Sequence, residues 1–133
     1  GMDAMGFVLG AGLAGRMGVG FLPIRKVGKL CVETDVVTFQ NYSGRVQQME
    51  MRDPVFAAGT RVLLADQWVE TGGTMAAGIE LVERQNGVVA GLAWTRLRDA
   101  AAEACAKQPS HAACQDPHDI ATGESTPSTR PGL

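Results

Sequence analysis

The sequence has few of the features that mark secreted, membrane or nucleic-acid-binding proteins. It has only three cysteines, an odd number without C-x-x-C spacing, which favours reduced thiols over a disulfide framework. Its longest uncharged apolar run, residues 4–15, is too short for a membrane span and lacks the basic start of a signal peptide. The net charge of −2 gives no reason to expect nucleic acid as a partner. We therefore expect a cytoplasmic protein that binds neither membranes nor nucleic acid.

The composition is that of a single folded domain followed by a tail. The chain has 133 residues, which is enough for a modest core, and its hydrophobic and charged contents are ordinary for a globular protein. Four of the six prolines fall within residues 109–133, where little could form a core. The cysteines and histidines near that segment match no common zinc-finger spacing, so no protein-held metal is expected. We expect a domain over residues 1–108 and a disordered tail over residues 109–133.

The strongest secondary-structure signal is a βαβ unit within residues 61–94. A continuous apolar run at residues 62–65 predicts a buried strand, and Met75, Ile79 and Val82 repeat with the spacing of one helix face. Asn86 and Gly87 supply a helix stop before the next apolar strand, at residues 88–94. The sequence therefore predicts an α/β fold with parallel strands.

Weaker patterns surround this unit. Two alternating stretches, residues 37–39 and 46–51, flank the turn signal at residues 41–44 and predict a β-hairpin or mobile flap. Residues 11–17 have the character of a helix. The other predictions are a strand at residues 19–24 and a last helix at residues 96–107.

The stretch GAGLAG, residues 10–15, has the G-x-G-x-x-G spacing of dinucleotide-binding sites. Such a site needs about a dozen helical residues before the next strand, which then ends in an acidic residue when the cofactor is NAD. Here the predicted helix is too short, and the next strand ends in Arg25 and Lys26. We therefore interpret the small residues as a means for a helix to pack close to a sheet.

The loop at residues 66–74, DQWVETGGT, is a better candidate for a ligand site. It lies between a predicted strand and a predicted helix, where open α/β sheets bind ligands. Backbone N–H groups and two hydroxyls of residues 71–74 could surround a phosphate, without the lysine of a Walker A loop. Asp66 could accept hydrogen bonds from ribose hydroxyls. A phosphate site beside a ribose site indicates a phosphorylated sugar as the ligand. The alternative is that T-G-G-T only caps a helix.

This order of apolar strand, acidic residue, T-G-G-T and amphipathic helix resembles the 5-phosphoribosyl 1-diphosphate (PRPP) motif of type I phosphoribosyltransferases. Residues 1–30 are similar to the diphosphate loop, helix and R-K-x-G-K-L flap start of adenine phosphoribosyltransferases. The likeness extends to residue 85. It implies a three-layer α/β/α fold with a mostly parallel sheet and a β-hairpin or flexible flap, from which the family's N-terminal part is missing.

The same resemblance implies a function. It implies transfer of ribose 5-phosphate from PRPP to a purine base, with adenine as the expected base, Mg²⁺ held mainly by PRPP and a homodimer as the assembly. Positioning, diphosphate neutralisation and exclusion of water would then carry the catalysis. GAGLAG becomes part of the helix behind the diphosphate loop, which explains its small residues.

The resemblance also assigns site residues by position. Glu70 could act as general acid or base toward the purine, or be a solvated loop residue, and Lys29 would lie on the flap. Those two are the implied catalytic residues. The implied PRPP and phosphate site is Asp66, Gln67, Val69, Glu70, Thr71, Gly72, Gly73 and Thr74, and the implied diphosphate site is Asp3, Ala4, Met5, Gly6, Arg25 and Lys29.

Two departures from the family pattern bear on how far this likeness holds. Met5 stands where the family's diphosphate loop has an arginine, which removes a charge-assisted contact. Gln67 replaces the second carboxylate of the usual acidic pair. These changes keep open an alternative, a regulatory protein of the same fold that binds PRPP or a nucleotide with little or no turnover. Trp68, beside the loop, could stack on a base or be a packing residue.

Overall fold

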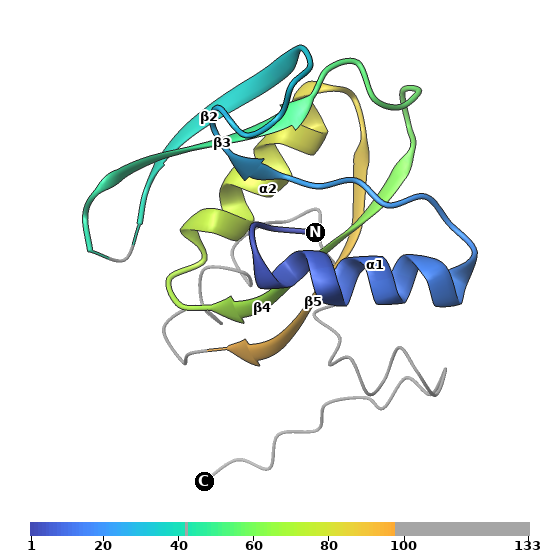
Figure 1. Ribbon diagram of the computed structural model, residues 1–133, viewed down its shortest axis with the longest axis horizontal. Helices are drawn as coiled ribbons and strands as arrows, with labels where there is room; N and C mark the ends of the chain where they lie inside the picture. Colours follow the sequence, from blue (N-terminus) through green and yellow to red (C-terminus); the bar gives the residue numbers. More distant parts are fainter. Residues whose placement is uncertain (42, 98–133) are drawn as a thin grey trace, which may run out of the picture.

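The computed structural model describes residues 1–41 and 43–97, and within them the chain forms an α/β fold (Figure 1). The α/β class predicted from the sequence is confirmed. Neither described helix is long and apolar enough to cross a membrane. The predicted tail and the predicted domain boundary at residue 108 lie outside the described residues. In chain order the elements are α1 (Met5–Met17), β1 (Arg25–Lys26), β2 (Thr34–Gln40), β3 (Val46–Arg52), β4 (Arg61–Val69), α2 (Gly73–Arg84) and β5 (Val88–Leu97).

The predicted βαβ unit is confirmed as β4, α2 and β5. The two strands pair in parallel, from Arg61 opposite Val88 to Val69 opposite Leu97. The predicted helix face, with Met75, Ile79 and Val82, is buried. The prediction of a helix starting at Arg96 is wrong, because Arg96 continues β5 and pairs with Trp68. The rest of that predicted helix lies outside the described residues.

The predicted β-hairpin is also confirmed. β2 and β3 pair antiparallel from Thr34 opposite Arg52 to Gln40 opposite Val46, and β1 pairs with the other side of β3. Asn41 organises the turn between them, since its Oδ1 accepts the backbone N–H groups of Ser43 and Arg45 at 3.0 and 2.9 Å. The hairpin extends away from the rest of the chain in Figure 1.

The N-terminal region differs from the prediction. α1 begins at Met5 rather than residue 11, and residues 19–23 form no strand. Ile24 alone makes a parallel bridge with Met2, whose N–H donates to the Ala65 carbonyl at 2.9 Å. Pro23 has no N–H to donate and Val19 is exposed, so a full strand has neither the hydrogen bonds nor the burial it needs. The first residues thus form a short link between β4 and the segment that leads into β1.

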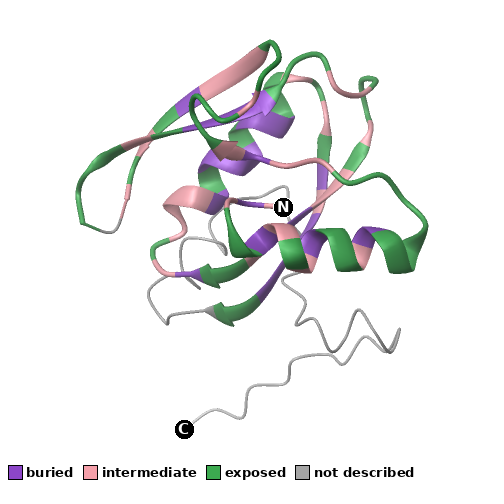
Figure 2. Cartoon of the chain, in the orientation of Figure 1, coloured by how far each residue is buried: buried purple, intermediate pink, exposed green. Residues whose placement is uncertain are grey.

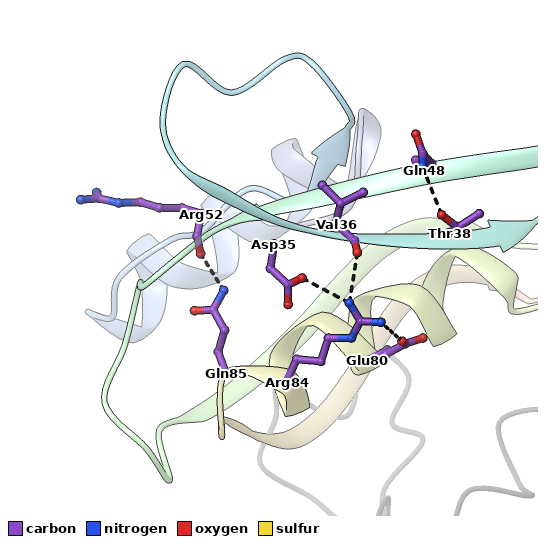
Figure 3. Close-up of polar contacts among 8 residues, drawn as sticks. All are labelled: Asp35, Val36, Thr38, Gln48, Arg52, Glu80, Arg84 and Gln85. Atoms are coloured by element: carbon purple, nitrogen blue, oxygen red, sulfur yellow. Dashed lines mark hydrogen bonds and ion pairs between the residues drawn. The ribbon is translucent and has the colours of Figure 1, made fainter.

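α2 joins the parallel pair to the antiparallel sheet, because it packs against strands of both. Figure 2 shows buried residues gathered on α2 and on the strands beside it. At the rim, Arg84 donates to Asp35 Oδ1 at 3.2 Å, to the Val36 carbonyl at 3.1 Å and to Glu80 Oε1 at 2.6 Å (Figure 3). The side chain of Gln85 donates to the Arg52 carbonyl at 2.8 Å. The core consists of Met2, Ile24, Val37, Met49, Met51, Leu64, Val69, Met75, Ala77, Ile79, Leu81, Val82, Val89, Leu92 and Trp94.

Candidate functional site

A cleft of about 490 Å³ lies where the end of β4, the first residues of the chain and the antiparallel sheet meet. Most residues predicted for the site line it: Asp3, Ala4, Met5, Asp66, Gln67, Val69, Glu70, Thr71, Gly72, Gly73 and Thr74. Gly6, Arg25 and Lys29 are not among the lining residues. Side chains that the sequence did not indicate also line it: Lys26, Phe39, Asn41, Gln47, Met49 and Met75.

The loop after β4 presents unused backbone donors to this cleft. α2 has no side-chain cap, and its first backbone hydrogen bond runs from Ala76 N–H to the Gly72 carbonyl at 2.8 Å. Within the described residues, the N–H groups of residues 71–74 donate to no protein acceptor. Gly72 has φ of +81°, a left-handed conformation that glycine adopts at little cost. Free N–H groups at a helix N-terminus carry partial positive charge, so this loop has the geometry of an anion site.

The loop also lies against the end of the hairpin. A Cβ at Gly73 would lie 2.8 Å from the Gln40 carbonyl oxygen and 3.3 Å from Phe39 Cδ2. Only glycine lets the two backbones come this close without a shift. The hairpin therefore forms the wall of the cleft that faces the anion loop.

β4 continues to Val69, so the prediction that the loop starts at residue 66 is wrong: Asp66 lies on the strand and Glu70 in the loop after it, and the two carboxylates differ in their surroundings. Asp66 is half-buried, and its Oδ1 accepts the N–H of Gln67 at 2.7 Å. Burial raises the pKa of Asp66, although backbone hydrogen bonds from Gln67 and Trp68 oppose this effect. Glu70 has one carboxylate oxygen, Oε2, that is buried and has no hydrogen-bond partner within the described residues. A buried oxygen argues against the alternative that Glu70 is a fully solvated loop residue. An acceptor without a partner at this position suits a ligand that has a hydrogen-bond donor, such as an N–H group.

A carboxylate, that of Asp3, links the first residues of the chain to β1 at the cleft. Asp3 Oδ2 accepts the N–H of Lys26 at 3.3 Å and lies 3.8 Å from Arg25 Nε. Arg25 also stacks over the Phe7 ring, with 5.7 Å from its guanidinium carbon to the ring centroid. The N-terminus of α1, which likewise has no side-chain cap, opens onto the cleft through Ala4 and Met5. The uncapped N-termini of both helices therefore face one cleft.

Strand alternation explains why Lys26 rather than Arg25 lines the cleft. In β1, Arg25 is opposite Glu50 and Lys26 is opposite Met49, and opposed residues share a face. Met49 lines the cleft and Lys26 does so with it, whereas Arg25 falls on the other face with Glu50. The basic pair was visible in the sequence, but the choice between its members depended on this pairing. Gly6 is instead a packing residue, buried against the backbone of β4.

The described residues offer no dedicated metal site of three or more His, Cys, Asp or Glu side chains. Asp3 and Asp66 are nevertheless carboxylates on the walls of the cleft. Mg²⁺ in proteins is often bound by one or two carboxylates together with substrate phosphates. The donor set therefore fits a magnesium ion that is held mainly by a phosphorylated substrate.

Comparison with known proteins gives named relatives, although no family model matches the chain. The chain is 45% identical to the adenine phosphoribosyltransferase of Cereibacter sphaeroides over 94 residues, which are 71% of this chain and 52% of that protein. It is 46% identical to the enzyme of the same name from Prosthecochloris aestuarii, with the same coverage. The chain thus spans about half the length of these relatives.

Solved structures agree with this likeness. The adenine phosphoribosyltransferase of Rhodothermus marinus superposes with a TM-score of 0.76 at 35% identity, covering 84% of this chain and 62% of that one. The Saccharomyces cerevisiae enzyme, solved with D-2,5-dideoxy-2,5-imino-altritol 1,6-bisphosphate and adenine, gives a TM-score of 0.72 at 33% identity, covering 77% and 57%.

Proposed function

Because this chain belongs to the type I phosphoribosyltransferase family, with adenine phosphoribosyltransferases as its named relatives, we propose that it carries the PRPP site of a purine phosphoribosyltransferase. The reaction transfers ribose 5-phosphate from PRPP to a purine, adenine by preference. The bond from ribose C1 to the diphosphate oxygen breaks, a bond from C1 to a purine nitrogen forms, and that nitrogen loses its proton. The products are a nucleoside monophosphate and diphosphate.

One observation carries this proposal: two uncapped helix N-termini face a single cleft that also contains Asp66. PRPP has a phosphate at one end, a diphosphate at the other and vicinal hydroxyls between them. The N–H groups of residues 71–74 suit the 5-phosphate, and Asp66 suits the ribose hydroxyls. The loop of residues 3–5 and the N-terminus of α1 suit the diphosphate, together with the positive charge of Lys26, the basic residue of the sequence-predicted pair that lines the cleft.

The chemistry asked of the protein is mostly electrostatic. Positive charge develops on the ribose as the diphosphate leaves, so orientation and diphosphate neutralisation supply most of the rate. Mg²⁺ bound by PRPP, with Asp3 or Asp66 nearby, would add to that neutralisation. Glu70 would take the proton from the purine; this role is supported by its buried Oε2, which has no hydrogen-bond partner among the described residues. The predicted homodimer and cytoplasmic location remain predictions.

Calorimetry tests the binding site directly. Wild type is titrated with Mg-PRPP and with AMP, beside Asp66→Ala and the control Glu33→Ala, which removes an exposed carboxylate that does not line the cleft. Loss of the ribose contacts should weaken both ligands by about tenfold or more in Asp66→Ala, since hydrogen bonds to a charged group contribute roughly 1.5–3 kcal/mol. Glu33→Ala should bind as wild type does. Absence of heat from wild type, or unchanged binding in Asp66→Ala, would reject the site.

The regulatory alternative is favoured by two residues, Met5 and Gln67, which bring no charge to the cleft. A labelled-base assay with adenine, hypoxanthine, guanine and xanthine separates the two functions. Formation of a nucleoside monophosphate from any base supports the enzyme, and the base that reacts fastest defines its specificity. Binding of PRPP without product from any of the four supports the regulatory protein.

A further inference from the structure

Glu50 is the only buried charged residue in the part of the chain that the structure describes, with 3% of its surface exposed. It lies on β3, on the face opposite to that of Met49 and Lys26, and so behind the wall of the cleft. Burial of a charge is costly unless hydrogen bonds compensate. A buried carboxylate directly behind a candidate site therefore requires a structural explanation.

Its carboxylate holds the turn that follows β1. Oε1 accepts the backbone N–H groups of Lys29 and Leu30, both at 2.7 Å, and Oε2 accepts the hydroxyl of Thr34 at 3.3 Å. Burial raises the pKa of Glu50, but the backbone hydrogen bonds outweigh it, so the pKa is lowered and the carboxylate is charged at neutral pH. Hydrogen bonds of this length to a charged carboxylate are stronger than hydrogen bonds between neutral groups.

This turn, residues 27–30, is connected to the cleft on its other side. The Lys26 N–H is fixed by Asp3 at 3.3 Å, and the Val27 N–H donates to the Gln48 carbonyl at 3.2 Å. Arg25 Nη1 reaches the Lys29 carbonyl at 3.4 Å. Residues 25–30 therefore contact two carboxylates: Asp3, which lines the cleft, and Glu50, which lies on the face of the sheet away from the cleft.

We propose that Glu50 is a positioning residue for the diphosphate end of the cleft: it fixes residues 27–30, the turn that directly follows Lys26, and so holds the charge of Lys26 at the cleft for PRPP. This inference rests on the proposed function. Without the hydrogen bonds to Glu50, residues 27–30 would have to become ordered when PRPP binds, and the entropy lost in that ordering would weaken PRPP binding. AMP has no diphosphate, so its binding does not depend on the turn.

The test compares Glu50→Gln, which keeps the shape and removes the charge, with wild type and with the control Val37→Ala. Val37 is a buried residue of the neighbouring strand that does not line the cleft, so its truncation lowers stability without removing a contact to the turn. Amide hydrogen exchange of Lys29 and Leu30 is followed by NMR, and the Kd values of Mg-PRPP and AMP are measured by calorimetry.

In Glu50→Gln the two amides should exchange about tenfold faster, because a charge-assisted hydrogen bond is replaced by a weaker neutral one. The Kd of PRPP should rise about three- to tenfold by the same loss, with that of AMP unchanged. Val37→Ala should leave the ratio of the two Kd values as in wild type. Unchanged exchange, or an equal change for both ligands, overturns the positioning role. Should wild type bind neither ligand, the proposed function and this role fail together.

Discussion

Replacement of Gly6 by alanine tests how closely α1 must lie against β4. A Cβ at this position would lie 2.6 Å from the Ala65 carbonyl oxygen and 3.2 Å from the Asp66 Cα. Both atoms belong to the backbone of a buried strand, so neither can rotate away. The helix and the strand must separate by several tenths of an ångström, which moves the loop of residues 3–5 away from Asp66.

The same helix provides the control for the magnitude. Alanine at Gly12, where nothing lies within 4 Å of the new Cβ, should stabilise the protein by about 0.5–1 kcal/mol through helix propensity. Gly6 lies in the first turn of α1, where the propensity gain from alanine is smaller, and alanine there adds overpacking, which typically costs about 1–3 kcal/mol. Both effects make Gly6→Ala the less stable of the two variants, and the packing cost is the larger of them.

Thermal unfolding followed by circular dichroism measures this difference. For a domain of this size, 1 kcal/mol corresponds to about 4–8 °C in Tm, so Gly6→Ala should melt at least about 4 °C below Gly12→Ala. PRPP binding should weaken in Gly6→Ala and not in Gly12→Ala. Equal melting temperatures for the two variants would refute the close approach of helix and strand.

Two further predictions concern Gln85, which links the end of α2 to β3, and Asp66, which lines the cleft. Gln85→Ala removes the donor to the Arg52 carbonyl and should lower the free energy of unfolding by about 1 kcal/mol in urea titrations, whereas the exposed neighbour Glu83→Ala should not. Burial raises the pKa of Asp66, so its contribution to stability is present below the unfolded pKa and is lost as pH rises through the folded pKa. Asp66→Asn should therefore melt above wild type at neutral pH, with a difference that disappears in acid. A difference that persists in acid contradicts the burial argument.

The βαβ unit could be predicted because several local signals coincide there. The apolar run of β4, the single apolar face of α2 and the Asn-Gly stop each specify the same arrangement without reference to distant residues. The end of β5 could not be predicted in this way. Arg96 has a good helix propensity, but pairing with Trp68 on β4 keeps it in the strand, and that contact is visible only once the sheet is formed.

The start of α1 is a second case in which distant contacts decide. Residues 5–9 form a short apolar run, which is ambiguous between strand and helix. Packing of Gly6 on the backbone of β4 favours the helix, and nothing local indicates that approach. The ligand site proposed at residues 66–74 could be predicted because its pattern is local, whereas the position of Lys26 at the cleft depends on the pairing of β1 with β3.

Glu50 shows the same limit for a buried charge. In the alternating stretch of residues 46–51 it occupies a polar position, which normally faces solvent. The turn of residues 27–30 covers it instead, and the turn lies about twenty residues earlier in the chain. A polar position in a strand pattern therefore predicts which face a residue is on, but not whether another segment covers that face.

Two glycine-rich stretches of this sequence are candidates for an anion site, and backbone hydrogen bonding favours the second. GAGLAG lies inside α1, where the N–H groups after the first turn are consumed by the helix itself. T-G-G-T precedes and begins α2, where the N–H groups of residues 71–74 donate to no acceptor within residues 1–41 and 43–97. Glycine spacing is thus not the property that binds a phosphate; what matters is the position of the glycines relative to a helix start. The N-terminus that α1 does offer lies upstream of GAGLAG, at Met5, and it opens onto the same cleft as that of α2.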